Sequence, residues 1–345
     1  SICVLSGIIV VALCLLLTTA ASAIETDKLT FRTDLAFDST AVSGGPDSMA
    51  LAVLLSQWAA AGGVRVHALI VDHGLRAESA AEAVGVAERL RRLPRVSSVV
   101  LKCEGFDDQS CVMENARAKR YDVLEAYCEE NGVAHLFLGH HQDDQAETFL
   151  FRLAKGSGLD GLAAMKAVQL RGELSLLRPF LELPKARLIA TCAAHNVEYV
   201  QDPSNEKDQF ARVRLRKSMD VLEVEGLSVK RLAVTASRMA RAREALEEIA
   251  QKAAEVIVKE KNTKQIVLNL NLWLAQPDEI ALRVILQCFE ALRVGEEYAP
   301  RMEKVEALFC DLRAPGPFRK RTLGGLVFER DDKSELVNIQ IEHTS

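Results

Sequence analysis

The chain has few aromatic residues, and its cysteines are scattered. Phe, Trp and Tyr make up 5% of the 345 residues, so a core must be built mainly from Ala, Leu and Val, and the hydrophobic fraction of 49% is large enough for this. None of the eight cysteines belongs to a C-x-x-C pair, which argues against a zinc ribbon or an iron–sulfur cluster. A disulfide framework is not expected in so long and aliphatic a chain. The pattern therefore indicates free thiols in a reducing compartment.

The chain also lacks an excess of basic residues, internal repeats and low-complexity tracts. Its formal net charge is −5. This value argues against a wholly basic surface that binds nucleic acid, but it leaves room for a local basic face. The length of the chain predicts two or three domains.

The segment Ser43-Gly44-Gly45-Pro46-Asp47-Ser48 gives the strongest chemical signal. It follows the short apolar run Ala41-Val42 and opens a helix expected over Met49–Ala61. Adjacent glycines allow the backbone to approach a ligand closely. Ser43 and Ser48 add hydroxyl donors, and the helix N-terminus adds unpaired N–H groups. We therefore expect all six residues to form a cradle for phosphate.

Asp47 determines which phosphate ligand suits this loop. Its carboxylate would repel a phosphate unless a divalent cation lay between them, so the loop predicts ATP with Mg²⁺ and makes Asp47 the metal ligand. The loop lacks the Gly-Lys-Ser/Thr ending of a Walker A loop and the G-x-G-x-x-G spacing of a dinucleotide fingerprint. An ordinary Gly-Gly turn capped by serine is the alternative.

Residues 2–24 carry no charged side chain. Leu13–Leu17 resembles the apolar core of a signal peptide and Ala21-Ser22-Ala23 its cleavage site, but no basic residue precedes them. We interpret residues 1–29 as a hydrophobic leader foreign to the native protein, with a genuine leader or a membrane anchor as alternatives. Because a secreted enzyme would lack ATP, we expect a cytoplasmic protein without membrane association.

Strands and helices alternate after residue 63. The periodicity predicts strands over Val64–Val71, Val96–Lys102 and Val133–Gly139 and helices over Glu78–Leu93, Glu114–Glu130 and Gln142–Leu153. Further strands are expected over Leu174–Phe180 and Val197–Gln201, with a helix over Pro184–His195 between them. This alternation predicts an α/β fold with a doubly wound parallel sheet, whose strand-ending loops meet at one ligand-binding edge. Residues 25–40 do not supply the expected apolar first strand, since Asp38 and Ser39 are polar.

The pattern becomes more helical and more charged from residue 208. Helices are expected over Asp208–Glu225, Val229–Lys259, Asp278–Leu292 and Arg301–Leu312, with a strand over Ile266–Leu272. We predict a catalytic domain over residues 30–226, a mainly helical substrate-binding domain over 227–313 and a short C-terminal tail over 314–345.

Polar residues follow two of the predicted strands and should lie at the ligand-binding edge. Asp72 and His73 end the strand Val64–Val71, where an Asp commonly meets a ribose or a metal. We expect both to line a nucleotide pocket, and a plain polar strand exit is the alternative.

The segment GHHQDDQAET, from Gly139 to Thr148, also begins at a strand end. Asp144 and Glu147 share one face of the following helix and could hold an amine or Mg²⁺. The histidine pair His140-His141 suggests a contact to metal or phosphate, so we expect Gly139 and His140 beside the nucleotide. A plain helix start with one core histidine is the alternative.

Basic residues gather in two helical segments. Arg117 and Arg120 share one face of the helix Glu114–Glu130 and could clamp phosphates. The second set comprises Arg212, Arg214, Arg216, Lys217, Lys230, Arg231, Arg238, Arg241 and Arg243. This set is the candidate for an RNA phosphate track in an otherwise acidic protein. A solvated helix face is the alternative.

The hexapeptide at 43–48 resembles the pyrophosphatase loop of the N-type ATP pyrophosphatases, the PP-loop superfamily. Taken together, the motifs resemble those of the bacterial tRNA(Ile)-lysidine synthetases. The matching motifs, in order, are SGGPDS at 43–48, VDHGLR at 71–76, ENARAKRY at 114–121, GHHQDDQAET at 139–148, RLAKGSGLDGLAAM at 152–165, RPFLELPKARL at 178–188 and DPSNEKDQFARVRLR at 202–216. The whole set is far more specific than the loop alone.

The resemblance implies a PP-loop fold and a two-step reaction. ATP would adenylate the C2 oxygen of the wobble cytidine in tRNA(Ile) with a CAU anticodon, and L-lysine would then displace AMP to give lysidine. The resemblance implies that Ser43, Gly44, Gly45 and Ser48 hold the phosphates, Asp47 the Mg²⁺, Asp144 and Glu147 the lysine, and Arg117 or Arg120 the phosphate charge, while His140 and Asp143 complete the pocket. Arg212, Arg214 and Arg216 would contact the tRNA.

Three alternatives to this reaction stay open. A thiolase-like enzyme of tRNA modification is disfavoured by the missing C-x-x-C pairs, and a relative of GMP or NAD synthetases is disfavoured by the GHHQDDQAET segment. The third is a non-catalytic protein that binds a nucleotide or RNA. The sequence also leaves the oligomeric state open, with a homodimer as one option.

Overall fold

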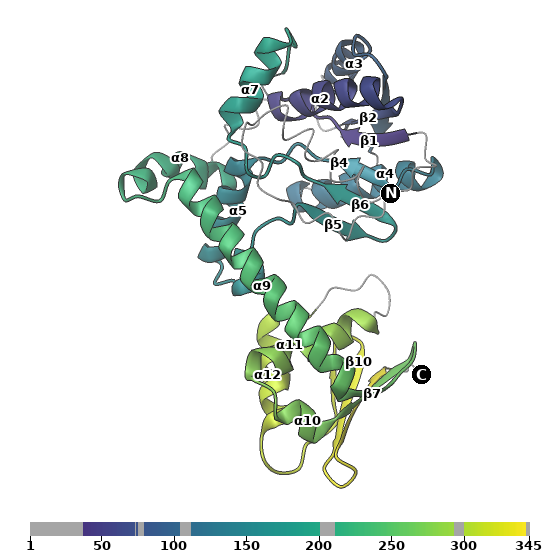
Figure 1. The fold of residues 1–345 in the computed structure, drawn as a ribbon, viewed down its shortest axis with the longest axis vertical. Coiled ribbons are helices and arrows are strands. Elements are labelled where there is room, and N and C mark those ends of the chain that lie inside the picture. Colours follow the sequence, from purple (N-terminus) through teal and green to yellow (C-terminus); the bar gives the residue numbers. More distant parts are fainter. Residues whose placement is uncertain are drawn as a thin grey trace. The chain divides into compact units, whose positions relative to one another are not determined.

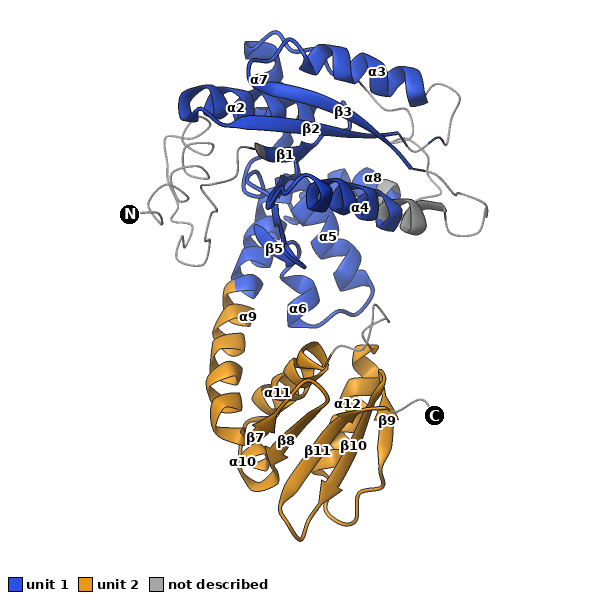
Figure 2. Ribbon diagram, turned by 90° about the vertical axis from the view of Figure 1, so that its right-hand side faces the viewer, with its two compact units in different colours: residues 1–240 blue, residues 241–345 orange. Residues whose placement is uncertain are grey.

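The computed structural model of the chain describes residues 37–72, 74, 79–103, 112–200, 211–292 and 300–342. The chain divides into two compact units, residues 1–240 and 241–345, which Figure 2 shows in different colours. Each unit has its own hydrophobic core. Among the helices in the described ranges, none has the length and apolar character needed to cross a membrane.

The first unit is built on a six-stranded sheet with the order β3-β2-β1-β4-β6-β5 (Figure 1). Its strands are β1 (Phe37–Ala41), β2 (Arg65–Asp72), β3 (Val96–Lys102), β4 (His135–Phe137), β5 (Val168–Arg171) and β6 (Leu174–Leu177). All neighbouring strands pair in parallel except β5, which joins β6 in antiparallel pairing at the edge. The mostly parallel sheet confirms the predicted α/β fold, and β5 is an edge strand that the periodicity does not predict.

Helices cover both faces of this sheet. One face is covered by α2 (Pro46–Gly62), α3 (Ser79–Leu90) and α7 (Lys185–Ala194), and the other by α4 (Val112–Glu130). Successive residues of β2 supply the two cores in turn, since Ala68 and Ile70 pack on the first side and Leu69 on the second. Burial on both faces is the doubly wound arrangement that the alternating pattern predicts.

A further group of helices packs around α5. Its members are α5 (Gln142–Ala154), α6 (Leu159–Leu162), α8 (Ala211–Val224) and the first turns of α9 (Val229–Ile257), which share an apolar cluster. The connection between α5 and α6 is tied down, because the Arg152 guanidinium donates to the carbonyl oxygens of Gly161 and Ala164 at 2.9 and 3.0 Å. Helix α5 lies directly after β4 in the chain and, with the loop before it, contains the GHHQDDQAET segment.

The first strand corrects the expectation for residues 25–40. β1 lies in the middle of the sheet, and its polar residues Asp38, Ser39 and Thr40 are all buried there. Asp38 Oδ1 lies 2.9 Å from His135 Nδ1 on β4, and Thr40 Oγ1 donates to the carbonyl oxygen of Phe137 at 3.3 Å. The neighbouring strand therefore supplies partners that allow polar side chains to be buried.

Two other sequence expectations are wrong. Residues 197–200 form no strand, and the Val200 N–H instead donates to the carbonyl oxygen of Gly44 at 2.8 Å; Gln201 lies outside the described residues. The strand expected over Ile266–Leu272 ends at Asn269, whose side-chain oxygen accepts the Leu272 N–H at 2.9 Å. This N-cap starts the short helix α10 (Leu270–Leu274).

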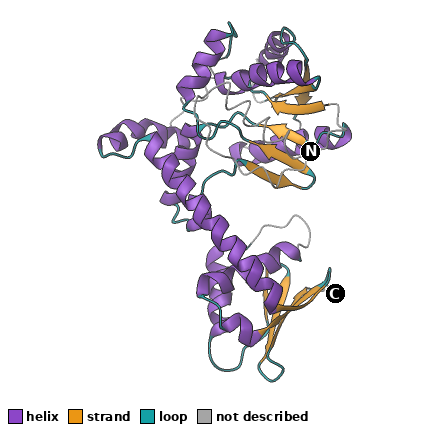
Figure 3. Ribbon diagram, in the orientation of Figure 1, coloured by secondary structure: helices purple, strands orange, loops and turns teal. Residues whose placement is uncertain are grey.

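The second unit combines helices with a five-stranded antiparallel sheet (Figure 3). The strands, in the order β7-β8-β11-β10-β9, are β7 (Val258–Lys261), β8 (Gln265–Asn269), β11 (Leu336–Ile341), β10 (Leu326–Asp331) and β9 (Arg321–Leu323), and α11 (Asp278–Ala291) and α12 (Met302–Arg313) join α10. Trp273 is fully buried and its Nε1 donates to the carbonyl oxygen of Ala281 at 2.9 Å. The last three strands, from the segment 314–345, complete this core.

Replacing Asp38 by Ala should destabilise the first unit. His135 would lose its carboxylate partner in the middle of the sheet, and an unsatisfied buried polar group costs about 1–3 kcal/mol. We expect D38A to lower the free energy of unfolding by about that amount, measured by urea denaturation. Glu129→Ala, at the exposed end of α4, is the control and should change it by less than about 0.5 kcal/mol. An unchanged midpoint for D38A would show that the contact does not stabilise the sheet.

Candidate active site

The candidate site lies where the connections of the first sheet change direction. From β1 the chain continues outwards through β2 and β3, whereas β4 lies on the opposite side of β1. In sheets of this kind, ligands bind beyond the carboxyl ends of the two strands at such a point. The loops that follow β1 and β4 contain the predicted residues Ser43, Gly44, Gly45, Gly139 and His140.

The loop after β1 has the geometry of an anion cradle. Gly44 has a φ of +85°, and a Cβ atom there would lie 2.6 Å from Val86 Cγ2, so only glycine suits the position. The Ser43 N–H donates to Ser48 Oγ, and Ser48 Oγ–H donates to the carbonyl oxygen of Gly45, each at 3.1 Å. No side chain caps the first turn of the 17-residue helix α2. The positive end of its dipole is therefore available to an anion.

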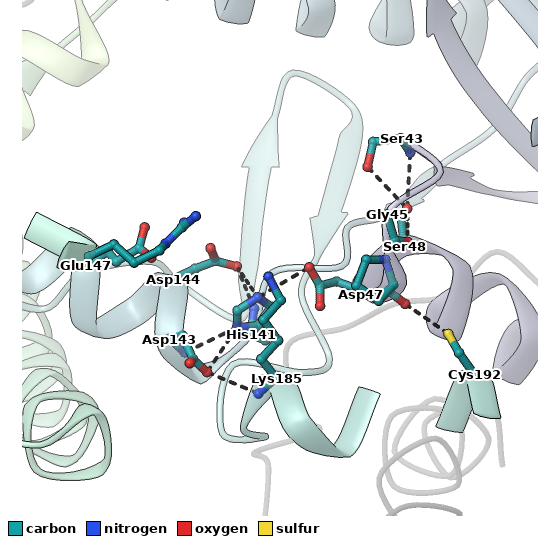
Figure 4. A network of polar contacts seen from close by, with 12 residues as sticks. Ser43, Gly45, Asp47, Ser48, His141, Asp143, Asp144, Glu147, Lys185 and Cys192 are labelled. Atoms are coloured by element: carbon teal, nitrogen blue, oxygen red, sulfur yellow. Dashed lines mark hydrogen bonds and ion pairs between the residues drawn. The ribbon is translucent and has the colours of Figure 1, made fainter. Parts of the chain in front are cut away.

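The loop after β4 packs closely against the first turn of α2. A Cβ atom on Gly139 would lie 3.1 Å from the backbone carbonyl of Asp47 and from the backbone nitrogen of Ser48. The missing side chain at position 139 therefore allows the two loops to touch. This contact places the start of α2 beside the start of α5 (Figure 4).

His141 lies at the centre of the site, among three carboxylates (Figure 4). Its Nε2 is 3.4 Å from Asp47 Oδ2 and 3.5 Å from Asp144 Oδ2, and its Nδ1 is 3.3 Å from Asp143 Oδ2. The residue is only 4% exposed. It is also the N-cap of α5, and its backbone N–H donates to Asp144 Oδ2 at 3.0 Å.

The carboxylates determine the charge of this ring. Burial alone would lower the pKa of His141, but hydrogen bonds with Asp143 and Asp47 and the charge of Asp144 together raise it to about 10. The raised pKa favours the cationic ring at neutral pH, and Nδ1 lies 3.3 Å from the Asp143 carboxylate and 3.2 Å from the Asp143 backbone nitrogen that the N-cap side chain faces. Burial would likewise raise the pKa of Asp143, but His141 and the Lys185 N–H, at 3.1 Å, hold it below its ordinary value. One cation among three carboxylates leaves an excess of negative charge that suits a divalent metal or an amine.

Glu147 lies one helical turn beyond Asp144 and meets a predicted tRNA-binding residue. Its side chain is 8% exposed, and its Oε1 lies 2.7 Å from Nε of Arg216 on α8. This hydrogen bond raises the pKa of Arg216, against the effect of burial. Leu215 packs on the apolar cluster around α5 next to this ion pair. The structure thus brings together Asp144, Glu147 and Arg216, which the sequence predicts as substrate-binding residues.

Asp72 and the two predicted α4 arginines have different surroundings. Asp72 Oδ1 accepts the Gly74 N–H at 3.0 Å and the Ser79 hydroxyl at 2.6 Å, so this carboxylate shapes the turn between β2 and α3. His73 and the side chain of Arg117 lie outside the described residues, and Arg120 is half-buried on α4.

The basic residues of α8 and α9 differ in exposure. Arg214 is exposed on α8, while the side chain of Arg212 lies outside the described residues. Arg243 is buried and lies 3.6 Å from Glu247, so its inclusion in the basic track is wrong.

The sequence does not predict the contacts of His141 and Cys192. The histidine pair led to the prediction of His140 as the ligand-binding residue, although His141 directly precedes the helix and an N-cap side chain faces the first helical turn, here Asp143 and Asp144. Cys192 of α7 donates its Sγ–H to the carbonyl oxygen of Pro46 at 3.3 Å. Burial, and then the charge of Asp47, raise the pKa of this thiol to about 11, so it stays protonated at neutral pH.

Asp47 suits the predicted role of a metal ligand. Its Oδ2 faces His141, while its Oδ1 is buried and has no hydrogen-bond partner among the described residues. Within the described ranges, no group of three or more His, Cys, Asp or Glu residues has the arrangement of a metal site. Because Mg²⁺ is commonly held by one or two carboxylates together with substrate phosphates and water, Asp47 suits Mg²⁺ in combination with a phosphate ligand.

Comparisons with known proteins agree with this geometry. The family model of the PP-loop domain matches residues 26–222. A protein of a Methylobacterium species named tRNA(Ile)-lysidine synthase is 42% identical over 296 residues, which cover 84% of this chain and 85% of that protein. Proteins of the same name from a Bradyrhizobium species and from Methylobacterium nodulans are each 40% identical, with 83% of this chain covered and 80% and 85% of theirs.

Replacing Gly44 by Ala should weaken ATP binding. The strained φ and the contact with Val86 would displace the loop, and we expect at least about tenfold weaker ATP binding by isothermal titration calorimetry, or about 1.4 kcal/mol. Gly63→Ala is the matched control, because Gly63 has a φ of +75° but a Cβ atom there would meet nothing within 4 Å. Equal losses of ATP affinity in the two variants would mean that backbone strain, and not the shape of the loop, is responsible.

Replacing Arg216 should destabilise the protein, because the buried Glu147 carboxylate would lose its positively charged partner. We expect Arg216→Ala to lower the free energy of unfolding by about 1–3 kcal/mol. The double variant with Glu147→Gln should recover part of this loss, because no buried charge remains, and the coupling energy should exceed about 0.5 kcal/mol. Arg214→Ala, on the exposed side of the same helix, is the control. A coupling energy of zero in urea denaturation would show that the ion pair does not hold α8 against α5.

Proposed function

This chain belongs to the tRNA(Ile)-lysidine synthase family, and we propose that it ligates L-lysine to C2 of the wobble cytidine of tRNA(Ile) with a CAU anticodon. The reaction consumes ATP and releases AMP and pyrophosphate. One observation of the structure carries the proposal: His141 lies 3.4 Å from the Asp47 carboxylate of the phosphate loop and 3.5 Å from the Asp144 carboxylate of α5. ATP and an amine can therefore be held next to each other at one edge of the sheet.

The first step is the activation of the base. The C2 oxygen of cytidine attacks the α-phosphorus of ATP, the bond between the α- and β-phosphates breaks, and pyrophosphate leaves. Ser43, Gly44, Gly45 and Ser48, with the N-terminus of α2, would hold the phosphates. Asp47 would hold Mg²⁺, which would offset the negative charge of the phosphates. Arg117 or Arg120 of α4 would stabilise charge on the phosphate during adenylation.

The second step is the transfer of lysine. The neutral ε-amine of lysine attacks C2 and loses a proton to solvent, the bond between C2 and its oxygen breaks, and AMP leaves with that oxygen. Asp144 and Glu147 bind the cationic groups of lysine and place its amine beside the adenylated base. In the structure, Oε1 of Glu147 already lies 2.7 Å from Nε of Arg216. Lysine therefore shares this carboxylate with Arg216 or displaces the guanidinium.

The RNA approaches through the basic helices. Arg214, Arg216 and Lys217 are exposed on α8, and the Glu147–Arg216 contact ties this helix to the α5 side of the site. Contacts to phosphates position an RNA without reading its sequence. The wobble cytidine must leave the anticodon stack before its C2 atom can enter the site. In a single-stranded loop, the free energy needed to unstack the base is small.

Replacing Asp47 should abolish the reaction. We would incubate the chain with ATP, Mg²⁺, lysine and tRNA(Ile) bearing a CAU anticodon, and digest the RNA for mass spectrometry. We expect lysidine at the wobble position, lost on chelation of the metal, and a decrease of at least about 100-fold for Asp47→Ala. Glu129→Ala is the control and should react at the wild-type rate. AMP release without lysidine would instead indicate another tRNA modification, and full activity of Asp47→Ala would refute the role of this carboxylate.

A further inference from the structure

We propose that His141 is a positioning residue that orients the Asp47 carboxylate toward the metal and couples it to the lysine-binding end of α5. This inference rests on the proposed function, because it concerns the metal and lysine sites of that reaction. The residues that hold the ligands are Asp47 and Asp144, and His141 acts through them.

The ring joins three helices that are far apart in the sequence. Asp47 comes from α2, and Asp143 and Asp144 come from the first turn of α5. Asp143 in turn accepts the backbone N–H of Lys185 at the start of α7, at 3.1 Å. A buried ring with a carboxylate on each nitrogen has little freedom to turn. His141 therefore holds the starts of α2 and α5 at a fixed separation.

The contact with His141 places the two carboxylate oxygens of Asp47 in different surroundings. Oδ2 lies 3.4 Å from His141 Nε2, while Oδ1 is buried without a hydrogen-bond partner among the described residues. An orphaned carboxylate oxygen in a buried position needs a cation or a donor from a ligand. Because Oδ2 faces the ring, Oδ1 is the oxygen that would be left to hold a metal ion.

The same nitrogen orients the lysine-binding carboxylate. Asp144 Oδ2 lies 3.5 Å from Nε2 and also accepts the His141 backbone N–H at 3.0 Å. These contacts leave Oδ1 of Asp144 for the amine. One imidazole edge thus faces the carboxylate proposed for the metal and the carboxylate proposed for lysine, and without it like charges would face each other.

A second buried histidine provides a control that distinguishes a structural role from an effect on the ligand-binding carboxylates. His135 is also buried, at 4% exposure, and its Nδ1 lies 2.9 Å from the Asp38 carboxylate. It lies on β4 of the same sheet but contacts none of the proposed ligand-binding carboxylates in any described contact. Substitution of either histidine removes a buried contact with a carboxylate, but of the two only His141 has Asp47 and Asp144 among its described contacts.

The experiment compares His141→Asn and His141→Gln with His135→Asn in the full chain. Binding of Mn²⁺, a paramagnetic probe for Mg²⁺, is measured by electron paramagnetic resonance with ATP present and tRNA absent. Groups that orient a metal ligand are worth about 10–100-fold in metal affinity. We therefore expect His141→Asn to weaken Mn²⁺ binding by at least about tenfold and to raise the KM for lysine more than it lowers kcat. The longer amide of His141→Gln should restore part of the metal affinity.

The thermal unfolding of each variant is measured to check that the variant is folded. His135→Asn should lower the melting temperature and leave Mn²⁺ affinity within about twofold of wild type, because its described contact is with Asp38 and not with a proposed ligand-binding group. Wild-type metal affinity in a folded His141→Asn or His141→Gln protein would overturn the proposal. So would a loss of metal affinity in His135→Asn as large as in His141→Asn, since it would indicate a structural effect. Because the Mn²⁺ measurement needs no tRNA, a wild-type protein that binds Mn²⁺ with ATP but forms no lysidine would refute the proposed function alone.

Discussion

The site depends on the parallel pairing of β1 with β4. Ser39 pairs with Leu136 and Thr40 with Phe137, and the Asp38–His135 contact belongs to the same two strands. Because parallel strands end at the same edge, this pairing carries the phosphate loop and the GHHQDDQAET segment to one place. A shift of one residue would turn every side chain of the strand to the opposite face. The polar contacts between the two strands therefore support the register on which the site is built.

The sequence was most informative where local rules decide the structure. The glycines and serines at 43–48 predicted a phosphate loop because a positive φ and a helix N-terminus are local properties. The alternating pattern likewise predicted the parallel sheet and the edge at which Asp144 and Glu147 lie. It failed at β1, because the partner that allows Asp38 to be buried is His135, 97 residues away in the chain. No local rule detects such a partner.

The choice between two adjacent histidines shows a finer limit of sequence reasoning. Both follow β4, and residue type alone does not say which one turns toward Asp47. The bridge between His141 and Phe180 and the packing of Gly139 on α2 decide this, and both depend on segments distant in the sequence. Similarly, the acidic face of α5 was visible in the spacing of Asp144 and Glu147, but Arg216 as the partner of Glu147 was not, since α8 reaches α5 only in the folded chain.

Helix α5 sets the spacing between the two sides of the proposed reaction. At its N-cap, His141 contacts Asp47 of the phosphate loop, and six residues later Glu147 contacts Arg216 of the basic helix α8. An α-helix rises about 1.5 Å per residue, so these contacts lie roughly 9 Å apart along a rigid axis. The buried face of α5, with Phe149 and Leu150, fixes that axis against its neighbours. A change in the packing of α5 would therefore shift both contacts together, whereas a change in α8 would shift only the contact with the basic helix.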